Sequence, residues 1–157
     1  MCYKRNSKQF LKAMKKIILF ALLFSATLSF SQNWTTSLEA AKTEAASSNK
    51  NILLVFSGSD WCAPCIKLDR TIFQTEVFKA EAAQKWVLVK ADFPKKKGNL
   101  LSVELTDSNK KLAEKYNKEG NFPLVVLLDT TGKVIGITGY KNVSPTEYVQ
   151  LLNAMIK

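Results

Sequence analysis

The chain has 157 residues, 46% of them hydrophobic, which corresponds to about one domain with enough apolar side chains for a buried core. The formal charge of +10 is concentrated in residues 1–31, which hold six basic side chains and no acidic one. From Gln32 onward, 17 basic and 13 acidic side chains give only +4, so no nucleic-acid partner is indicated. The chain has no histidine, which excludes Cys–His protease chemistry.

Residues 1–31 have the pattern of a secretory signal peptide. A basic stretch ends at Lys16, an apolar run follows, and the small residues Ser29 and Ser31 precede the expected cleavage point. The apolar stretch spans 14 residues, fewer than the ~20 that cross a bilayer, and no cysteine follows it for a lipid anchor. Met14 is an alternative start of translation. We therefore predict a periplasmic or secreted protein without stable membrane insertion after cleavage, with an uncleaved anchor as the alternative.

Residues 32–157 are expected to form one domain of alternating helices and strands. In chain order, we predict a helix over 37–46, a buried strand over 52–56, a helix from 62 to about 71, a short helix over 76–84, a buried strand over 86–92, a helix from 107 or 108 to 116, a strand over 122–129, a hairpin turn over 130–133, a strand over 134–138 and a C-terminal helix after 144. The expected helix caps, in the same order, are Thr35 or Thr36, Thr75, Asp107 or Ser108, and Ser144. Pro145 and Glu147 complete a capping-box pattern at the last helix.

The order of these elements predicts the fold class. Helices separate the first three strands, so we expect parallel neighbours, and the tight hairpin adds one antiparallel strand. The result is an α/β domain with a mixed central sheet and helices on both faces.

Two cysteines, Cys62 and Cys65, remain once the leader carrying Cys2 is removed. One close pair cannot form a disulfide framework, and it falls short of the four ligands of a structural zinc site, so no metal is expected. At a helix start, unpaired N–H groups favour a thiolate on Cys62, while Cys65 lies one turn deeper and should be more shielded. We expect Cys62 to attack a disulfide and Cys65 to release the product, without any bound cofactor. Pro64 suits the first helical turn.

The run from Phe56 through Trp61-Cys62-Ala63-Pro64-Cys65 resembles the active-site segment of the thioredoxin superfamily. Gly120-Asn121-Phe122-Pro123 is similar to that family's cis-proline landmark, and the stretches 71–77 and 86–92 are similar to exported thioredoxin-like proteins. The resemblance covers essentially all of 32–157 and implies a thioredoxin fold. It implies that Trp61 packs beside the site, that Pro123 is cis, and that the backbone of Phe122 pairs with an extended substrate segment. The Ala63-Pro64 dipeptide is close to the Gly-Pro of reducing thioredoxins and favours the reducing direction.

One departure from the family concerns proton transfer. Thioredoxins commonly carry a buried acid where this chain has Phe56, and Lys90 matches the lysine that accompanies that acid. Lys90, Asp60 or a water molecule are therefore the candidates for the proton of Cys65.

Two functions follow from these observations. The first is a monomeric enzyme that exchanges electrons with protein thiol and disulfide substrates and with a redox partner protein. The missing acid motivates the second, a thioredoxin-fold binding module whose disulfide is static. The run Lys95–Lys97 indicates a solvated loop, with steering of an acidic partner as an alternative.

Overall fold

The computed structural model describes residues 32–156, so the predicted signal peptide lies outside the described residues. The elements in chain order are β1 (Trp34–Thr35), α2 (Leu38–Ser48), β2 (Asn51–Ser57), α3 (Ala63–Leu68) with a π-helical turn (Asp69–Phe73), α4 (Glu76–Lys85), β3 (Trp86–Asp92), a 3-10 turn (Lys97–Asn99), α5 (Val103–Tyr116), β4 (Leu124–Leu128), β5 (Val134–Thr138) and α6 (Pro145–Ala154). None of the helices within 32–156 is both long and apolar enough to cross a membrane.

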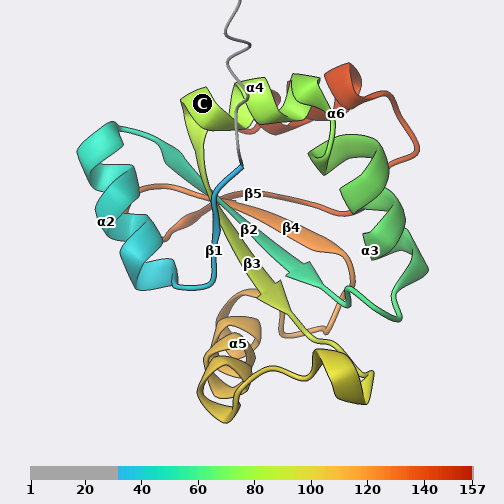
Figure 1. Cartoon of the computed structure of the whole chain (residues 1–157). Helices are drawn as coiled ribbons and strands as arrows, with labels where there is room; N and C mark the ends of the chain where they lie inside the picture. The colour runs from blue at the N-terminus through green and yellow to red at the C-terminus, as the bar shows by residue number, and fades with distance from the viewer. Residues whose placement is uncertain (1–31, 157) are drawn as a thin grey trace, which may run out of the picture.

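The five strands form one mixed sheet in the order β1-β3-β2-β4-β5 (Figure 1). β1 and β2 run parallel to β3, whereas β4 is antiparallel to β2 and β5 is antiparallel to β4. The prediction of three parallel strands is therefore wrong for β4. The reason is visible in Figure 1, where α5 lies at the end of the sheet toward which β2 and β3 point. Because the chain does not return along the sheet before β4, that strand enters from the end where β3 leaves.

Helices cover both faces of the sheet, as predicted. Helices α3, α4 and α6 lie on one face, and α2 and α5 lie on the other (Figure 1). Side chains of β2 alternate between the two cores: Leu53 and Val55 join the first, and Ile52, Leu54 and Phe56 join the second. All five are at most 2% exposed, which explains why the strand reads as a continuous apolar run. The disulfide described below lies where this buried strand leaves the sheet.

The helix caps agree with the sequence at two helices and differ at two. Thr75 caps α4, and Ser144 forms the predicted capping box with Glu147. The cap of α2 is Ser37, whose hydroxyl accepts the N–H of Ala40, because Thr35 belongs to β1. Helix α5 begins at Val103 after the cap Ser102, one turn before the predicted start. Val103 is 73% exposed, and an apolar residue at an exposed position breaks the pattern by which the first turn of this helix could be predicted from the sequence.

Candidate active site

Cys62 and Cys65 form a disulfide across the first turn of α3, with their Cα atoms 5.2 Å apart. Cys62 is the N-cap residue, and its Sγ accepts the N–H of Cys65 at 3.2 Å. The N–H of Cys62 in turn donates to the carbonyl of Gly58 at 2.9 Å, which closes the turn between β2 and α3. This arrangement directs the N–H of Cys65, which has no carbonyl partner within the helix, at the sulfur that we expect to react, where it stabilises negative charge.

Both cysteines lie just beneath the surface. Cys62 is 5% exposed and Cys65 is 3% exposed, so the expected contrast in shielding is small in this oxidised state. Ala63 and Pro64, the two residues between them, are exposed and form the outer side of the turn.

The cis-proline landmark faces the same region. The Phe122–Pro123 peptide bond is cis, and Pro123 lines an open groove of about 460 Å³ together with Pro64 and Tyr140. The ring of Phe122 packs edge-on against Trp61 and against Phe93, at centroid distances of 5.5 and 5.4 Å. The structure therefore brings together the predicted residues Trp61, Pro64, Phe122 and Pro123, which come from segments about 60 residues apart in the chain.

Trp61 anchors a neighbouring loop to the active-site turn. Its Nε1 donates to the carbonyl of Phe93 at 2.7 Å, and the ammonium of Lys95 lies 3.9 Å from a ring centroid of the indole. A Cβ at position 58 would lie 2.4 Å from the indole, so this turn requires Gly58. Trp61 remains 40% exposed, which leaves part of the ring as apolar surface beside Cys62.

Asp60 binds the same loop rather than facing the cysteines. Its carboxylate accepts the N–H groups of Lys95 and Lys96 and the side-chain amide of Asn99, each at 3.0 Å. These hydrogen bonds, foremost the one from Lys95, lower the pKa of Asp60 from its ordinary value. A carboxylate with a lowered pKa and three donors is a poor proton acceptor, so the geometry does not support the predicted proton-handling role for Asp60.

Lys90 lies on the opposite face of the sheet from Phe56. In the register of β2 and β3, Phe56 is paired with Ala91 and Lys90 with Val55, and neighbouring strand residues point to opposite faces. The expected match between Lys90 and a lysine beside the Phe56 position is therefore wrong. Phe56 itself is fully buried on the α2 and α5 side.

On the α3 face, Lys90 forms an ion pair with Asp69 at 3.5 Å. Asp69 follows Cys65 by four residues, and its backbone N–H donates to the carbonyl of Cys65. It begins the π-helical turn, a feature that occurs frequently at functional sites. Asp69 was not among the residues predicted from the sequence; its i,i+4 spacing places it on the same face of the helix as Cys65.

A cysteine pair bonded across the first turn of a helix, in a thioredoxin fold and facing a cis-proline, defines a thiol–disulfide oxidoreductase. The chain belongs to the thioredoxin-like family, whose model matches residues 33–130. It is 33% identical over 126 residues to the disulfide bond reductase DsbH of Chlamydia pneumoniae, covering 80% of this chain and 72% of that protein.

Solved structures agree with this assignment. A structure described as DsbH oxidoreductase superimposes with a TM-score of 0.74 at 31% identity, over 80% of this chain and 85% of that one. A thioredoxin from Thermus thermophilus gives a TM-score of 0.59 at 16% identity, over 79% of this chain and 86% of that one, and supports the fold alone. The predicted fold and enzyme class are therefore confirmed.

Proposed function

We propose that the protein reduces disulfides in exported proteins through Cys62 and Cys65. The observation that carries the proposal is the disulfide across the first turn of α3, with the N–H of Cys65 directed at Cys62 Sγ. The reducing direction is supported by the likeness to a relative described as a disulfide bond reductase. The Ala63-Pro64 dipeptide, close to the Gly-Pro of reducing thioredoxins, points the same way.

The reaction starts from the dithiol form. The thiolate of Cys62 attacks one sulfur of a substrate disulfide, a Cys62–substrate mixed disulfide forms, and the first substrate thiol leaves. Cys65 then attacks Cys62 Sγ, which releases the second substrate thiol and leaves the disulfide seen here. In the net reaction, two electrons and two protons pass from the dithiol of the protein to the substrate, which leaves as two thiols. A dithiol donor protein must restore the starting form.

The groove beside Pro123 supports a role in substrate binding. Phe122 immediately precedes the cis bond, and Pro64 and Pro123 both line this groove. We propose that the backbone of Phe122 pairs with an extended substrate segment laid along it, which would align the substrate disulfide with Cys62. Trp61, packed against Phe122, supports this surface.

For the Cys65 proton, we propose Lys90 acting with Asp69 in place of the acid absent at position 56. The support is their ion pair on the α3 face and the backbone bond from Asp69 to Cys65. Replacing Lys90 by Met should slow release of product from the mixed disulfide while leaving its formation unchanged, as followed by rapid acid quenching. Equal release rates in the variant and the wild type would contradict this role.

We further propose that residues 1–31 are a cleaved signal peptide and that the mature protein works as a monomer in the periplasm or outside the cell, without a bound cofactor. The support is the basic and apolar pattern of that segment. N-terminal sequencing of the exported protein should begin at Gln32. A mature protein that starts at Met1 or Met14 would contradict the cleavage.

Insulin reduction in the presence of dithiothreitol tests the main proposal. The wild type should accelerate precipitation of the insulin B chain, and Cys62→Ser should not. Equal rates in the two proteins would refute catalysis by this pair. A redox titration separates the enzyme from the static-disulfide alternative, because a reduction potential far below about −300 mV suits a structural bond.

A further inference from the structure

The loop that follows β3 is held in a fixed position beside the disulfide. Asp60 accepts hydrogen bonds from the backbone of Lys95 and Lys96, and Trp61 donates to the carbonyl of Phe93. The N–H of Phe93 donates to the carbonyl of Ser57 at 2.8 Å, so both ends of the active-site turn contact the loop. The loop is thus part of the surface that a protein substrate meets when it approaches Cys62.

This loop, residues 93–99 and hereafter the lysine loop, presents positive charge to solvent. Lys95, Lys96 and Lys97 are all exposed, and among residues 32–156 the ammonium groups of Lys96 and Lys97 have no hydrogen-bond or ion-pair partner. The two carboxylates next to the loop are engaged by internal donors: Asp60 by the loop backbone, and Asp92 by the N–H and hydroxyl of Ser59. Both carboxylates therefore already accept hydrogen bonds, while Lys95 packs its ammonium over the Trp61 ring and Lys96 and Lys97 remain exposed.

Positive charge also lies on the other side of the disulfide. Lys67 follows Cys65 by two residues, and its ammonium lies 5.4 Å from the ring centroid of Tyr140, which lines the groove beside Pro123. Lys141, next in the chain, is exposed. The carboxylate of Glu119 accepts the side-chain amide of Asn121, one of the residues that line the groove, at 3.1 Å. Five lysines thus flank a site to which Asp60 and Asp92 contribute two negative charges.

We propose that the protein substrate of this site carries acidic side chains around its disulfide, and that Lys96 and Lys97 select it by electrostatic attraction. The proposal rests on the proposed function, since it concerns the partner of the same cysteine pair. Clustered charge of one sign raises the association rate of an oppositely charged partner by 10 to 10³-fold, and the gain falls with ionic strength. The exposed lysines thus act before chemistry, when the substrate first meets the protein.

Three synthetic peptides test this selection. Each has the same length and one internal disulfide, and they differ only in four flanking residues, which are all Glu, all Lys or all Ser. The pre-reduced protein is mixed with each peptide in single turnover, and the second-order rate constant is measured at about 20 mM and about 500 mM salt, where the Debye length falls from about 20 Å to a few Å. We expect the Glu peptide to react about tenfold faster than the Lys peptide at low salt and nearly equally at high salt.

Two charge-reversal variants locate the effect. Lys96→Glu/Lys97→Glu should lower the Glu-to-Lys rate ratio at least about threefold at low salt, with the Ser peptide unchanged. Lys111→Glu/Lys133→Glu changes the net charge by the same amount on α5 and in the β4–β5 turn, and should retain most of the ratio. Equal rates for the Glu and Lys peptides in the wild type, or equal losses in the two variants, would overturn the selection. If the Ser peptide is reduced but no charge preference appears, only the selection fails. If none of the three peptides is reduced, the proposed function fails as well.

Discussion

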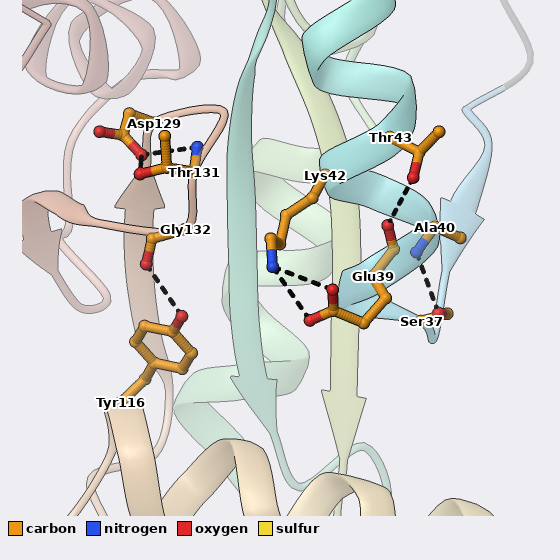
Figure 2. A network of polar contacts seen from close by, with 9 residues as sticks. All are labelled: Ser37, Glu39, Ala40, Lys42, Thr43, Tyr116, Asp129, Thr131 and Gly132. Carbon is orange, nitrogen blue, oxygen red and sulfur yellow. Dashed lines mark hydrogen bonds and ion pairs between the residues drawn. The ribbon is translucent and has the colours of Figure 1, made fainter.

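Two aspartates at opposite ends of the sheet organise its turns in different ways. Asp129 accepts hydrogen bonds from the N–H and hydroxyl of Thr131 (Figure 2). It also accepts the N–H of Lys133, so all three donors lie within four residues of it. Asp60 accepts its three bonds from residues 35 to 39 positions away in the chain. One carboxylate closes its own turn, and the other holds a distant loop beside the active site. The same chemistry therefore stabilises local structure at one end and assembles a functional surface at the other.

The turn after β4 is also tied to a helix. Tyr116 of α5 donates its hydroxyl to the carbonyl of Gly132 at 2.9 Å, and Figure 2 shows the Lys42–Glu39 ion pair of α2 nearby. Gly132 has a φ of +87°, which a residue with a side chain rarely adopts. These contacts serve stability, since none of them involves a residue of the disulfide, of Asp60 or of the lysine loop.

Of the substitutions that distinguish the active-site end of the sheet from the end with the β4–β5 turn, Cys65→Ser should have the largest effect on activity. Without the second sulfur, the mixed disulfide between Cys62 and a substrate cannot resolve, so catalytic turnover should be abolished and a covalent adduct with insulin should accumulate. Mass spectrometry under non-reducing conditions measures the adduct. Cys62→Ser is the matched control and should form none. An adduct of equal yield in both variants would show that the assignment of the attacking sulfur is wrong.

At the other end, Gly132→Ala should reduce stability without reducing activity. The left-handed φ and the approach of a new Cβ to 3.2 Å from the Tyr116 hydroxyl should lower the free energy of unfolding by about 1–3 kcal/mol. Urea denaturation measures this loss, and the insulin rate constant per folded molecule should stay the same.

Gly98→Ala is the matched substitution in the lysine loop. A Cβ there meets nothing within 4 Å, so the free energy of unfolding should change by less than about 0.5 kcal/mol. If the two alanine variants lost equal stability, backbone strain at Gly132 would not be the cause.

This difference between local and distant contacts also explains what the sequence predicted. The cysteine pair, the capping box at Ser144 and the strand over Trp86–Asp92 are signalled within ten residues, and all three are present. The predictions of the direction of β4 and of the sheet face that carries Lys90 are wrong, because both features depend on pairings between segments distant in the chain. Asp60 is the clearest case, since nothing near it in sequence reveals that its partners begin at Lys95.

Asp60→Asn should change backbone hydrogen exchange at residues distant in the chain, whereas Asp129→Asn should change it only within its own turn. An amide oxygen accepts fewer of these hydrogen bonds, so Asp60→Asn should expose the backbone N–H groups of Lys95 and Lys96 and speed their hydrogen exchange about tenfold. Asp129→Asn should speed exchange only at Thr131 and Lys133. Site-resolved exchange by NMR measures both. Unchanged exchange at 95 and 96 in the first variant would mean that Trp61 alone fixes the loop.

The smallest expected effect is on the pH dependence of stability. Hydrogen bonds, foremost from the Lys95 N–H to Asp60 and from the Thr131 hydroxyl to Asp129, lower the pKa of both carboxyls below the ordinary value. Each group therefore contributes stability that is fully present above about pH 4 and is lost as pH falls through its folded-state pKa.

The free energy of unfolding, measured with urea at pH 6, 4 and 3, should fall as the pH falls. It should fall less steeply in each Asp→Asn variant than in the wild type. The absolute slope also contains other carboxyls with a lowered pKa, such as Glu147, so only the difference between variant and wild type reports on one aspartate. Both differences should have the same sign although only Asp60 acts across the chain, because linkage depends on the pKa shift and not on where the donors come from. A variant as pH-sensitive as the wild type would show that its carboxylate makes no net contribution to folding.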